Sequence, residues 1–414
     1  MVSTLALCNR QPLGFDLGWS ARLCARGEQP GERLPAPTAT KDDVAYYTED
    51  DAGARRRSFA GGWIGWGLIS ALAIGFGVLA FVPTDYVIEK PGPSFDTLGT
   101  LEVEGDTVSL IDIPSQQTYP TTGSLTMLTV STVGSRENPA SWLDVALATF
   151  DPSNDAVDVD LVFPDGETSE QSAEIGAAQM RESQQAAIAA ALSAAGYEYS
   201  SKLSVLATVE GAPAAGVLLE GDVITLVNGE AVTGAAALRA LIAENGIETP
   251  ITMTVDRDGT LTELAITPVL SDAETPEPII GVQLAAEYLF PFEVNVQLSD
   301  VGGPSAGQIF ALAIIDKLTP GSLNGGLAVA GTGTISADGM IGPIGGVTQK
   351  LYGAKNAGAH YFLLPASNCT DLAAANVPGG LDIYAVGTLA DSVNVLTTLA
   401  SGAGTSLLPR CSIE

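Results

Sequence analysis

The sequence is poor in charged residues and especially poor in basic ones. Charged residues make up 16% of its 414 residues, and 48 acidic against 18 basic side chains give a formal net charge of −30. A nucleic-acid surface needs clustered lysine and arginine, so we expect no nucleic-acid partner. The phosphate-binding pattern G-x-x-x-x-G-K-[ST] is missing from these residues, so ATP-driven work has no support.

Histidine and cysteine are also scarce. The single histidine, His360, excludes a His-rich metal site and allows a Ser-His-Asp triad only if that one ring serves. We read it as structural. The four cysteines contain no C-x-x-C pair and are too few for a disulfide scaffold. We therefore expect neither a metal nor another cofactor.

One long segment has no charge at all. Residues 58–84 form 27 consecutive uncharged positions, and about 20 apolar residues are enough to cross the hydrocarbon core of a membrane. A cleaved signal peptide is the competing interpretation, but some 57 residues precede this segment and its apolar core is longer than a signal sequence requires. The pattern favours a retained, single-pass transmembrane helix in contact with membrane lipid.

The charges beside this segment predict its orientation. Three arginines at 55–57 precede it, whereas Asp85 and Glu89 follow it. Basic flanks stay inside, so residues 1–57 are expected to be a disordered cytoplasmic tail and the remainder to lie outside the cell membrane. Cys369 and Cys411 would then lie in an oxidising compartment. Either they form a disulfide that holds the C-terminal tail, residues 401–414, or they are two unrelated buried thiols.

The exported part shows alternating strand and helix signals, which predicts a mixed α+β fold. Residues 85–199 contain β-rich runs followed by a helix over 173–195. Residues 200–269 contain short apolar strands with two tight-turn dipeptides, Asn228-Gly229 and Asp258-Gly259. Residues 277–400 alternate glycine-rich turns, strands and helices.

The segment 211–232 (GAPAAGVLLEGDVITLVNGEAV) resembles a PDZ domain of the kind attached to exported bacterial proteases. The resemblance predicts a PDZ fold over residues 200–269. A PDZ domain binds an extended peptide as an added strand, so this module is expected to recruit substrate. A role as a mere spacer is the alternative.

Three motifs in the last third occur in a characteristic order. GGPSAG spans residues 302–307, a Thr-Gly pair begins at Thr332, and PIGG at 343–346 precedes Lys350 by four residues. Pro-x-x-Asn follows at 365–368. This series resembles the proteolytic domain of the Lon family of Ser–Lys peptidases, which implies that Ser305 is the nucleophile and that Lys350 is the general base.

The resemblance also assigns supporting residues. Thr332 aligns with the threonine that supports the lysine, and the turn formed by Gly303, Pro304 and Ala306 would expose the hydroxyl and form the oxyanion hole. The chemistry agrees with these residue types: a serine needs a nearby base, and a lysine becomes one only when burial lowers its pKa.

The order of anchor, PDZ module and Ser–Lys domain resembles the bacterial membrane-anchored, PDZ-containing Lon-like proteases. MRESQQAA, residues 180–187, looks like a helix near the start of Lon proteolytic domains, so residues 85–199 are possible parts of that domain, with the PDZ module inserted. The expected function is an ATP-independent serine endopeptidase that acts on exported peptides or membrane proteins. The runner-up is an inactive PDZ scaffold that binds exported C-termini. Substrate, cleavage-site preference, homo-oligomerisation and the sign of any PDZ effect stay open.

Overall fold

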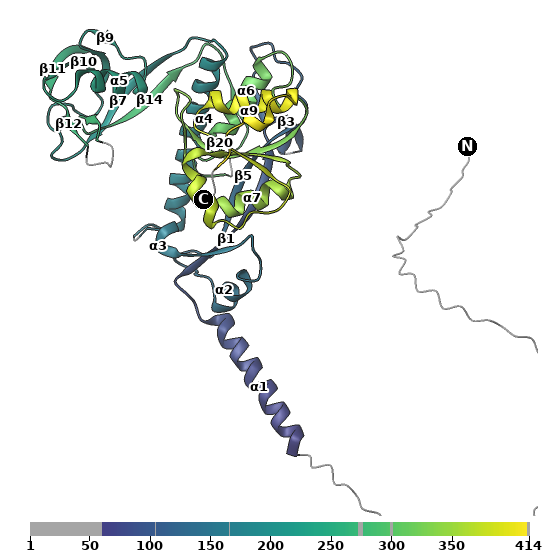
Figure 1. The fold of residues 1–414 in the computed structure, drawn as a ribbon. Helices are drawn as coiled ribbons and strands as arrows, with labels where there is room; N and C mark the ends of the chain where they lie inside the picture. Colours follow the sequence, from purple (N-terminus) through teal and green to yellow (C-terminus); the bar gives the residue numbers. More distant parts are fainter. Residues whose placement is uncertain (1–59, 104, 165, 272–275, 299–300, 412–414) are drawn as a thin grey trace, which may run out of the picture. The chain divides into compact units, whose positions relative to one another are not determined.

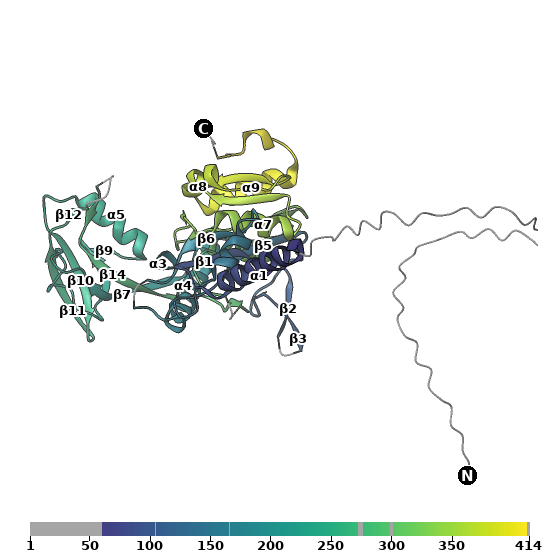
Figure 2. The same cartoon turned by 90° about the horizontal axis from the view of Figure 1, so that it is seen from below.

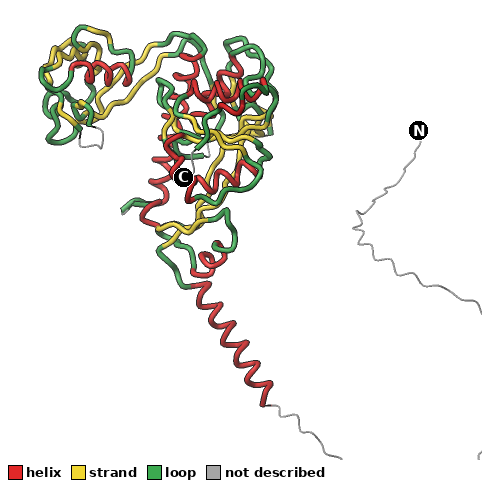
Figure 3. The backbone as a smooth tube through the Cα atoms, viewed as in Figure 1, coloured by secondary structure: helices red, strands yellow, loops and turns green. Residues whose placement is uncertain are grey.

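The structure of the chain is a computed structural model, which describes residues 60–411 except 104, 165, 272–275 and 299–300. Helices and strands alternate along this part of the chain (Figure 3), so the expected mixed α/β class is confirmed. The tail expected over residues 1–57 lies outside the described residues.

One of two six-stranded sheets is mixed and has the order β20-β19-β16-β5-β1-β6. Its strands are β1 (Tyr86–Asp96), β5 (Ser124–Val133), β6 (Asp155–Asp158), β16 (Ala328–Gly331), β19 (Tyr361–Pro365) and β20 (Asp382–Val386). The four strands from β20 to β5 run parallel, and β1 and β6 join antiparallel. Segments more than 190 residues apart in the sequence, such as β5 and β16, therefore share one set of backbone hydrogen bonds.

Helices cover both faces of this sheet. Side chains alternate along a strand, and in β5 Leu125 and Met127 enter one apolar core whereas Leu128 enters the other. The first core includes residues of α4 (Ser169–Ala194), α6 (Gly307–Leu318) and α9 (Leu389–Ser401). The second core includes residues of α7 (Val347–Asn356) and α8 (Cys369–Ala374). In both views α7 lies beside β5 (Figures 1 and 2).

A second sheet has the order β11-β10-β8-β7-β14, with β9 beside β8. Its elements are β7 (Ser200–Thr208), β8 (Val223–Val227), β9 (Glu230–Ala231), α5 (Ala235–Asn245), β10 (Ile251–Arg257), β11 (Thr260–Ile266) and β14 (Val282–Leu289). Both predicted turn dipeptides join hairpin strands, and Asn228 and Asp258 adopt positive φ values of 50° and 52°. Asparagine, aspartate and glycine tolerate that backbone conformation, which explains the sequence signal.

This second sheet extends beyond the boundary expected at residue 269. β14 pairs with β7 along its whole length, from Val282 opposite Thr208 to Leu289 opposite Ser200. Residues 282–289 fall in the segment expected to belong to the proteolytic domain. They pair here because β7 offers a free edge, and a strand gains stability when its backbone groups find partners. The chain thus enters and leaves this module through two adjacent strands.

The remaining elements are short or lie at the beginning of the described chain. They are α1 (Ala60–Phe81), β2 (Thr100–Val103), β3 (Asp106–Ser109), β4 (Ile111–Asp112), α2 (Trp142–Ala148), α3 (Val159–Val162), β12 (Val269–Leu270), β13 (Pro278–Ile279), β15 (Asn295–Val296), β17 (Thr334–Ile335) and β18 (Ile341–Gly342). No helix in the described part of the chain has the length and apolarity needed to cross a membrane. The transmembrane helix expected over residues 58–84 is therefore not supported.

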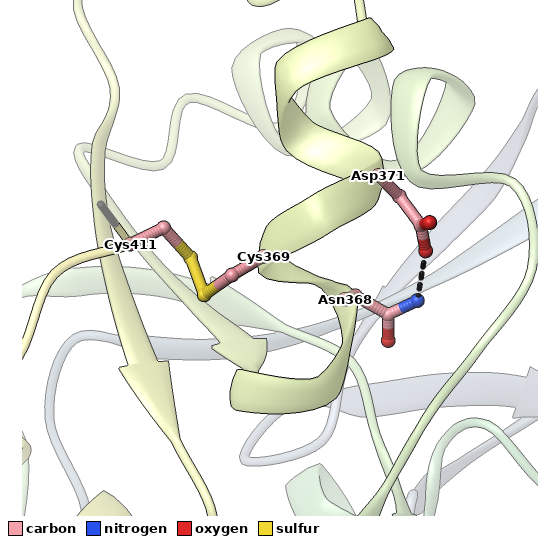
Figure 4. The surroundings of a disulfide bond; sticks show 4 residues. All are labelled: Asn368, Cys369, Asp371 and Cys411. Atoms are coloured by element: carbon pink, nitrogen blue, oxygen red, sulfur yellow. Dashed lines mark hydrogen bonds between the residues drawn. A yellow bond between two sulfur atoms is a disulfide. The ribbon is translucent and has the colours of Figure 1, made fainter. Parts of the chain in front are cut away.

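The open question about the two C-terminal cysteines is answered by the structure. Cys369, the first residue of α8, forms a disulfide with Cys411, 42 positions later, and their Cα atoms are 5.2 Å apart (Figure 4). Close to Cys411, the backbone N–H of Ala385 in β20 donates to the carbonyl of Pro409, and Arg410 forms an ion pair with Asp382. The end of the described chain is thereby attached to the edge of the sheet.

Candidate active site

Ser305 lies in the turn that leads into α6. Gly303 has a φ of +87°, a conformation that L side chains rarely adopt, so glycine is required there. Pro304 follows with its fixed φ, and Ala306 is the N-cap residue of α6. The GGPSAG sequence thus produces a sharp change of direction immediately before a buried helix, and Ser305 remains half-buried on it.

Helix α4 fixes the position of this turn through hydrogen bonds. The N–H of Gly303 donates to the carbonyl of Gly176 at 2.9 Å, and the hydroxyl of Ser183 donates to the carbonyl of Pro304 at 2.8 Å. A Cβ on Gly302 would lie only 3.2 Å from the Gly176 backbone, so the two segments approach as closely as two glycines allow. Residues about 120 positions away therefore fix the position of the Ser305 turn.

The N-terminus of α6 provides hydrogen-bond donors beside Ser305. The first amides of a helix have no partner within the helix, and the partial positive charge of the dipole collects there. Among the described residues, none accepts a hydrogen bond from the backbone N–H of Ser305 or Ala306. These two amides are therefore available to an oxyanion that forms next to the Ser305 hydroxyl.

Lys350 is placed by the first turn of α7. That helix starts after Gly346, whose φ is +67° and whose carbonyl accepts the Lys350 backbone N–H at 3.0 Å. The Lys350 side chain is only 3% exposed. Burial lowers its pKa to about 8, and the neighbouring Glu89 carboxylate opposes this by raising it. At neutral pH a useful fraction of Lys350 is therefore uncharged, as a general base requires.

Thr332 connects the two predicted catalytic residues. Its hydroxyl donates to the backbone carbonyl of Ser305 at 3.0 Å and accepts a hydrogen bond from Lys350 Nζ at 3.2 Å. The Gly333 amide also donates to the Ser305 carbonyl, at 2.8 Å. Thr332 is 1% exposed. A neutral lysine amine that donates one N–H to Thr332 keeps its lone pair free for another proton.

Ser305 and Lys350 line the same cavity, which has a volume of about 510 Å³. Its walls come from the turn before α6, from β1 and β5, from the loop that leads into α7 and from α4. The lining residues are Glu89, Pro93, Met127, Leu128, Thr129, Val130, Ser131, Met180, Val301, Gly302, Pro304, Ser305, Ala306, Thr334, Pro343, Ile344, Gly345, Gly346 and Lys350. Backbone, apolar and polar surface thus surround the two side chains.

The structure brings most of the sequence-predicted site residues together. Ser305, Pro304, Ala306 and Lys350 all line the cavity. Gly303 and Thr332 are not among the lining residues. The N–H of Gly303 donates to the carbonyl of Gly176 in α4, and the hydroxyl of Thr332 donates to the carbonyl of Ser305. His360 is exposed before β19 and is not among the residues that line the cavity.

Sequence reasoning missed a pair of facing carboxylates, one of which, Glu89, acts on Lys350. Glu89 on β1 lies opposite Asp155 on β6, and Asp155 accepts a hydrogen bond from the Gln349 side chain at 2.9 Å. Burial raises the pKa of Glu89, Asp155 raises it further, and Lys350 lowers it. No motif marks these residues, because their proximity depends on the register between β1 and β6.

The C-terminal part of the chain is similar to a domain of known proteins. Residues 299–398 match the Lon protease (S16) C-terminal proteolytic domain. Lon protease 1 of Sorangium cellulosum is 39% identical over 93 residues, which cover 22% of this chain and 11% of that protein. The Mycolicibacterium smegmatis Lon protease is 33% identical over 106 residues, which cover 25% and 13%. The chain therefore spans about a tenth of the length of the Lon proteases it matches.

A solved structure is similar to about a fifth of the chain. The PDZ domain of the SdrC-like protein from Listeria innocua is 24% identical, with a TM-score of 0.19, and the match covers 20% of this chain and 92% of that domain.

Proposed function

We propose that this protein is a serine endopeptidase in which Ser305 is the nucleophile and Lys350 is the general base. The observation that carries the proposal is the chain of contacts from Lys350 through Thr332 to the Ser305 backbone, around a lysine whose pKa burial lowers to about 8. The similarity of residues 299–398 to Lon proteolytic domains supports the same reaction class.

The proposed reaction uses these groups in two steps. Neutral Lys350 takes the hydroxyl proton of Ser305 while the oxygen attacks the carbonyl carbon of the substrate peptide bond. The resulting oxyanion accepts hydrogen bonds from the amides of Ser305 and Ala306. Protonated Lys350 then gives its proton to the leaving amine, and the peptide bond breaks to leave an ester on Ser305. Water, deprotonated by Lys350, hydrolyses this ester in the same manner.

The substrate class is a second part of the proposal. The proposed reaction at Ser305 and Lys350 consumes no ATP, and we propose that the protein acts without it. The cavity, with a volume of about 510 Å³, would receive short peptides, loops or unstructured segments rather than folded domains. We assign recruitment of such segments to the module formed by residues 200–289, because its sheet and α5 resemble a module that binds extended peptides.

The catalytic proposal is tested by labelling and by hydrolysis. A fluorophosphonate probe should label the wild-type protein at Ser305 and should not label Ser305→Ala. Lys350→Arg should abolish hydrolysis of a fluorogenic peptide, because a guanidinium stays protonated. Lys355→Arg, an exposed lysine on the same helix, is the matched control and should keep wild-type activity. If the probe does not label Ser305 while the protein still binds peptide C-termini, the scaffold alternative is correct.

The recruitment proposal needs a deletion that respects the sheet. Lys202 and Glu287 lie opposite each other, so residues 203–286 can be replaced by a two-residue Asn-Gly turn that closes β7 onto β14. This variant should hydrolyse a small peptide normally and cleave an unfolded protein more slowly. If the variant cleaves both substrates at the wild-type rate, the module is only a spacer.

Location is a separate proposal. The Cys369–Cys411 disulfide and the arginines at 55–57 favour export of the catalytic part to an oxidising compartment. Anchoring by residues 58–84 is proposed from the sequence pattern alone, since no described helix supports it. A reporter that is active only outside the membrane, fused after residue 414, should give signal; signal from a cytosol-only reporter there would contradict export.

A further inference from the structure

The side chain of Asn368 forms an unusually complete set of hydrogen bonds. Its Oδ1 accepts the backbone N–H of Ile344 at 3.0 Å, and its Nδ2 donates to the carbonyl of the same residue at 2.9 Å. Nδ2 also donates to Asp371 Oδ2 at 2.7 Å (Figure 4). Asn368 is 1% exposed. The amide therefore pairs with the Ile344 backbone much as a neighbouring strand would.

The residue that Asn368 holds belongs to the active-site cavity. Ile344 lines it, together with the next two residues, Gly345 and Gly346. Gly346 then begins α7 and accepts the backbone N–H of Lys350. Asn368 itself does not line the cavity. Its influence on the reacting groups would pass through the Ile344 backbone and along six residues to Lys350.

The other side of this segment is fixed by van der Waals contact. A Cβ on Gly346 would lie 2.5 Å from Cγ2 of Val130, so the start of α7 sits directly against β5. Asn368 and β5 thus restrain the segment 343–346 from two sides. Asn368 is in turn followed by Cys369, whose disulfide to Cys411 attaches the start of α8 to the C-terminal segment (Figure 4).

We propose that Asn368 is a positioning residue for the Ser305–Lys350 site, because it fixes the cavity wall at Ile344 and thereby the start of the helix that carries Lys350. This proposal rests on the proposed peptidase function. Loss of the amide leaves the N–H and the carbonyl of Ile344 without these partners. The segment then rearranges to find other partners, which changes the burial of Lys350 near Glu89.

The first test is the kinetics of Asn368→Ala with a fluorogenic peptide. We expect kcat/KM to fall at least tenfold and the midpoint of its rise with pH to move upward, because a less buried lysine has a higher pKa. Asn394→Ala, the same change at an exposed position of α9, is the matched control and should behave as wild type. A folded Asn368→Ala protein with an unchanged pH midpoint and unchanged kcat/KM would overturn the proposal.

A second variant protects the test against a failure to fold. Asn368→Asp combined with Asp371→Asn keeps a donor–acceptor pair between these positions and keeps an acceptor for the Ile344 N–H. At the Ile344 carbonyl it replaces the donating amide by a carboxylate oxygen, which cannot donate and repels the carbonyl oxygen. This protein should keep the other two hydrogen bonds and show a change in the same direction as Asn368→Ala. Wild-type kinetics and pH midpoint in the folded double variant would refute the positioning role.

Hydrogen exchange separates this proposal from the peptidase proposal. In Asn368→Ala or the double variant, the amides of residues 344–346 should exchange at least tenfold faster than in wild type, while those of Phe362 and Leu363 in β19 should not change. This readout needs no activity. Absence of wild-type hydrolysis and Ser305 labelling would remove the peptidase function alone, whereas unchanged exchange at residue 344 would remove the role of Asn368.

Discussion

Peptide hydrolysis by the wild-type protein should rise with pH through a midpoint near the Lys350 pKa of about 8. A lysine with that pKa is deprotonated in roughly one molecule in eleven at pH 7. With the ordinary value of 10.5 it would be deprotonated in only about one in 3,000, so burial supplies about 300 times more active base. We therefore expect kcat/KM to increase about tenfold from pH 7 to pH 9.

Glu89→Gln provides the sharper form of this test. The Glu89 carboxylate raises the pKa of Lys350, so its removal should move the midpoint to lower pH and increase kcat/KM at pH 7. The assay is a pH series with a fluorogenic peptide under conditions where the rate is proportional to enzyme and substrate. Lys355→Arg serves as the control because this exposed residue should leave the profile unchanged.

Two results would refute the reasoning. A profile with no change between pH 7 and pH 9 would mean that no group of pKa about 8 controls the reaction. A midpoint that moves upward in Glu89→Gln would mean that the carboxylate acts on the lysine in another way than through its charge. Retention of most activity in Lys350→Arg would exclude Lys350 as the base altogether.

Three further predictions concern stability. Lys350→Met should raise the free energy of unfolding by about 3 kcal/mol below pH 8, because the lowered pKa of the lysine costs stability there. This gain should decrease toward pH 10.5, and thermal unfolding at a series of pH values measures it. Cys411→Ser should lower the free energy of unfolding by about 4 kcal/mol, from the chain entropy of a loop closed over 42 residues, and wild type under reducing conditions should match it in a urea titration. Gly346→Ala should lower the free energy of unfolding by about 1–3 kcal/mol, because its φ of +67° and the contact with Val130 both exclude a Cβ. The urea midpoint and the activity should both decrease, and an unchanged urea midpoint would contradict this.

The sequence predicts the parts of the site that form continuous motifs. The Ser305 turn and the Lys350 helix each depend on neighbours within a few residues, so glycine and proline patterns reveal them. Glu89 and Ser183 could not be found in this way, since their roles come from strand register and from packing of α4 against a turn about 120 positions later. The pairing of β14 with β7 could not be predicted for the same reason, because no local pattern specifies it.

The paired entry and exit strands of the module over residues 200–289 have a consequence for how such a chain can change. Because Ser200 and Leu289 are opposite partners, the module leaves its host at two points about one strand spacing apart, roughly 5 Å. Any domain whose own termini are adjacent strands could be exchanged at this point without rerouting the host sheet, and closing a short loop there costs little entropy. The paired strands β7 and β14 thus mark a position at which one substrate-recruiting domain could replace another, independently of the chemistry proposed for Ser305.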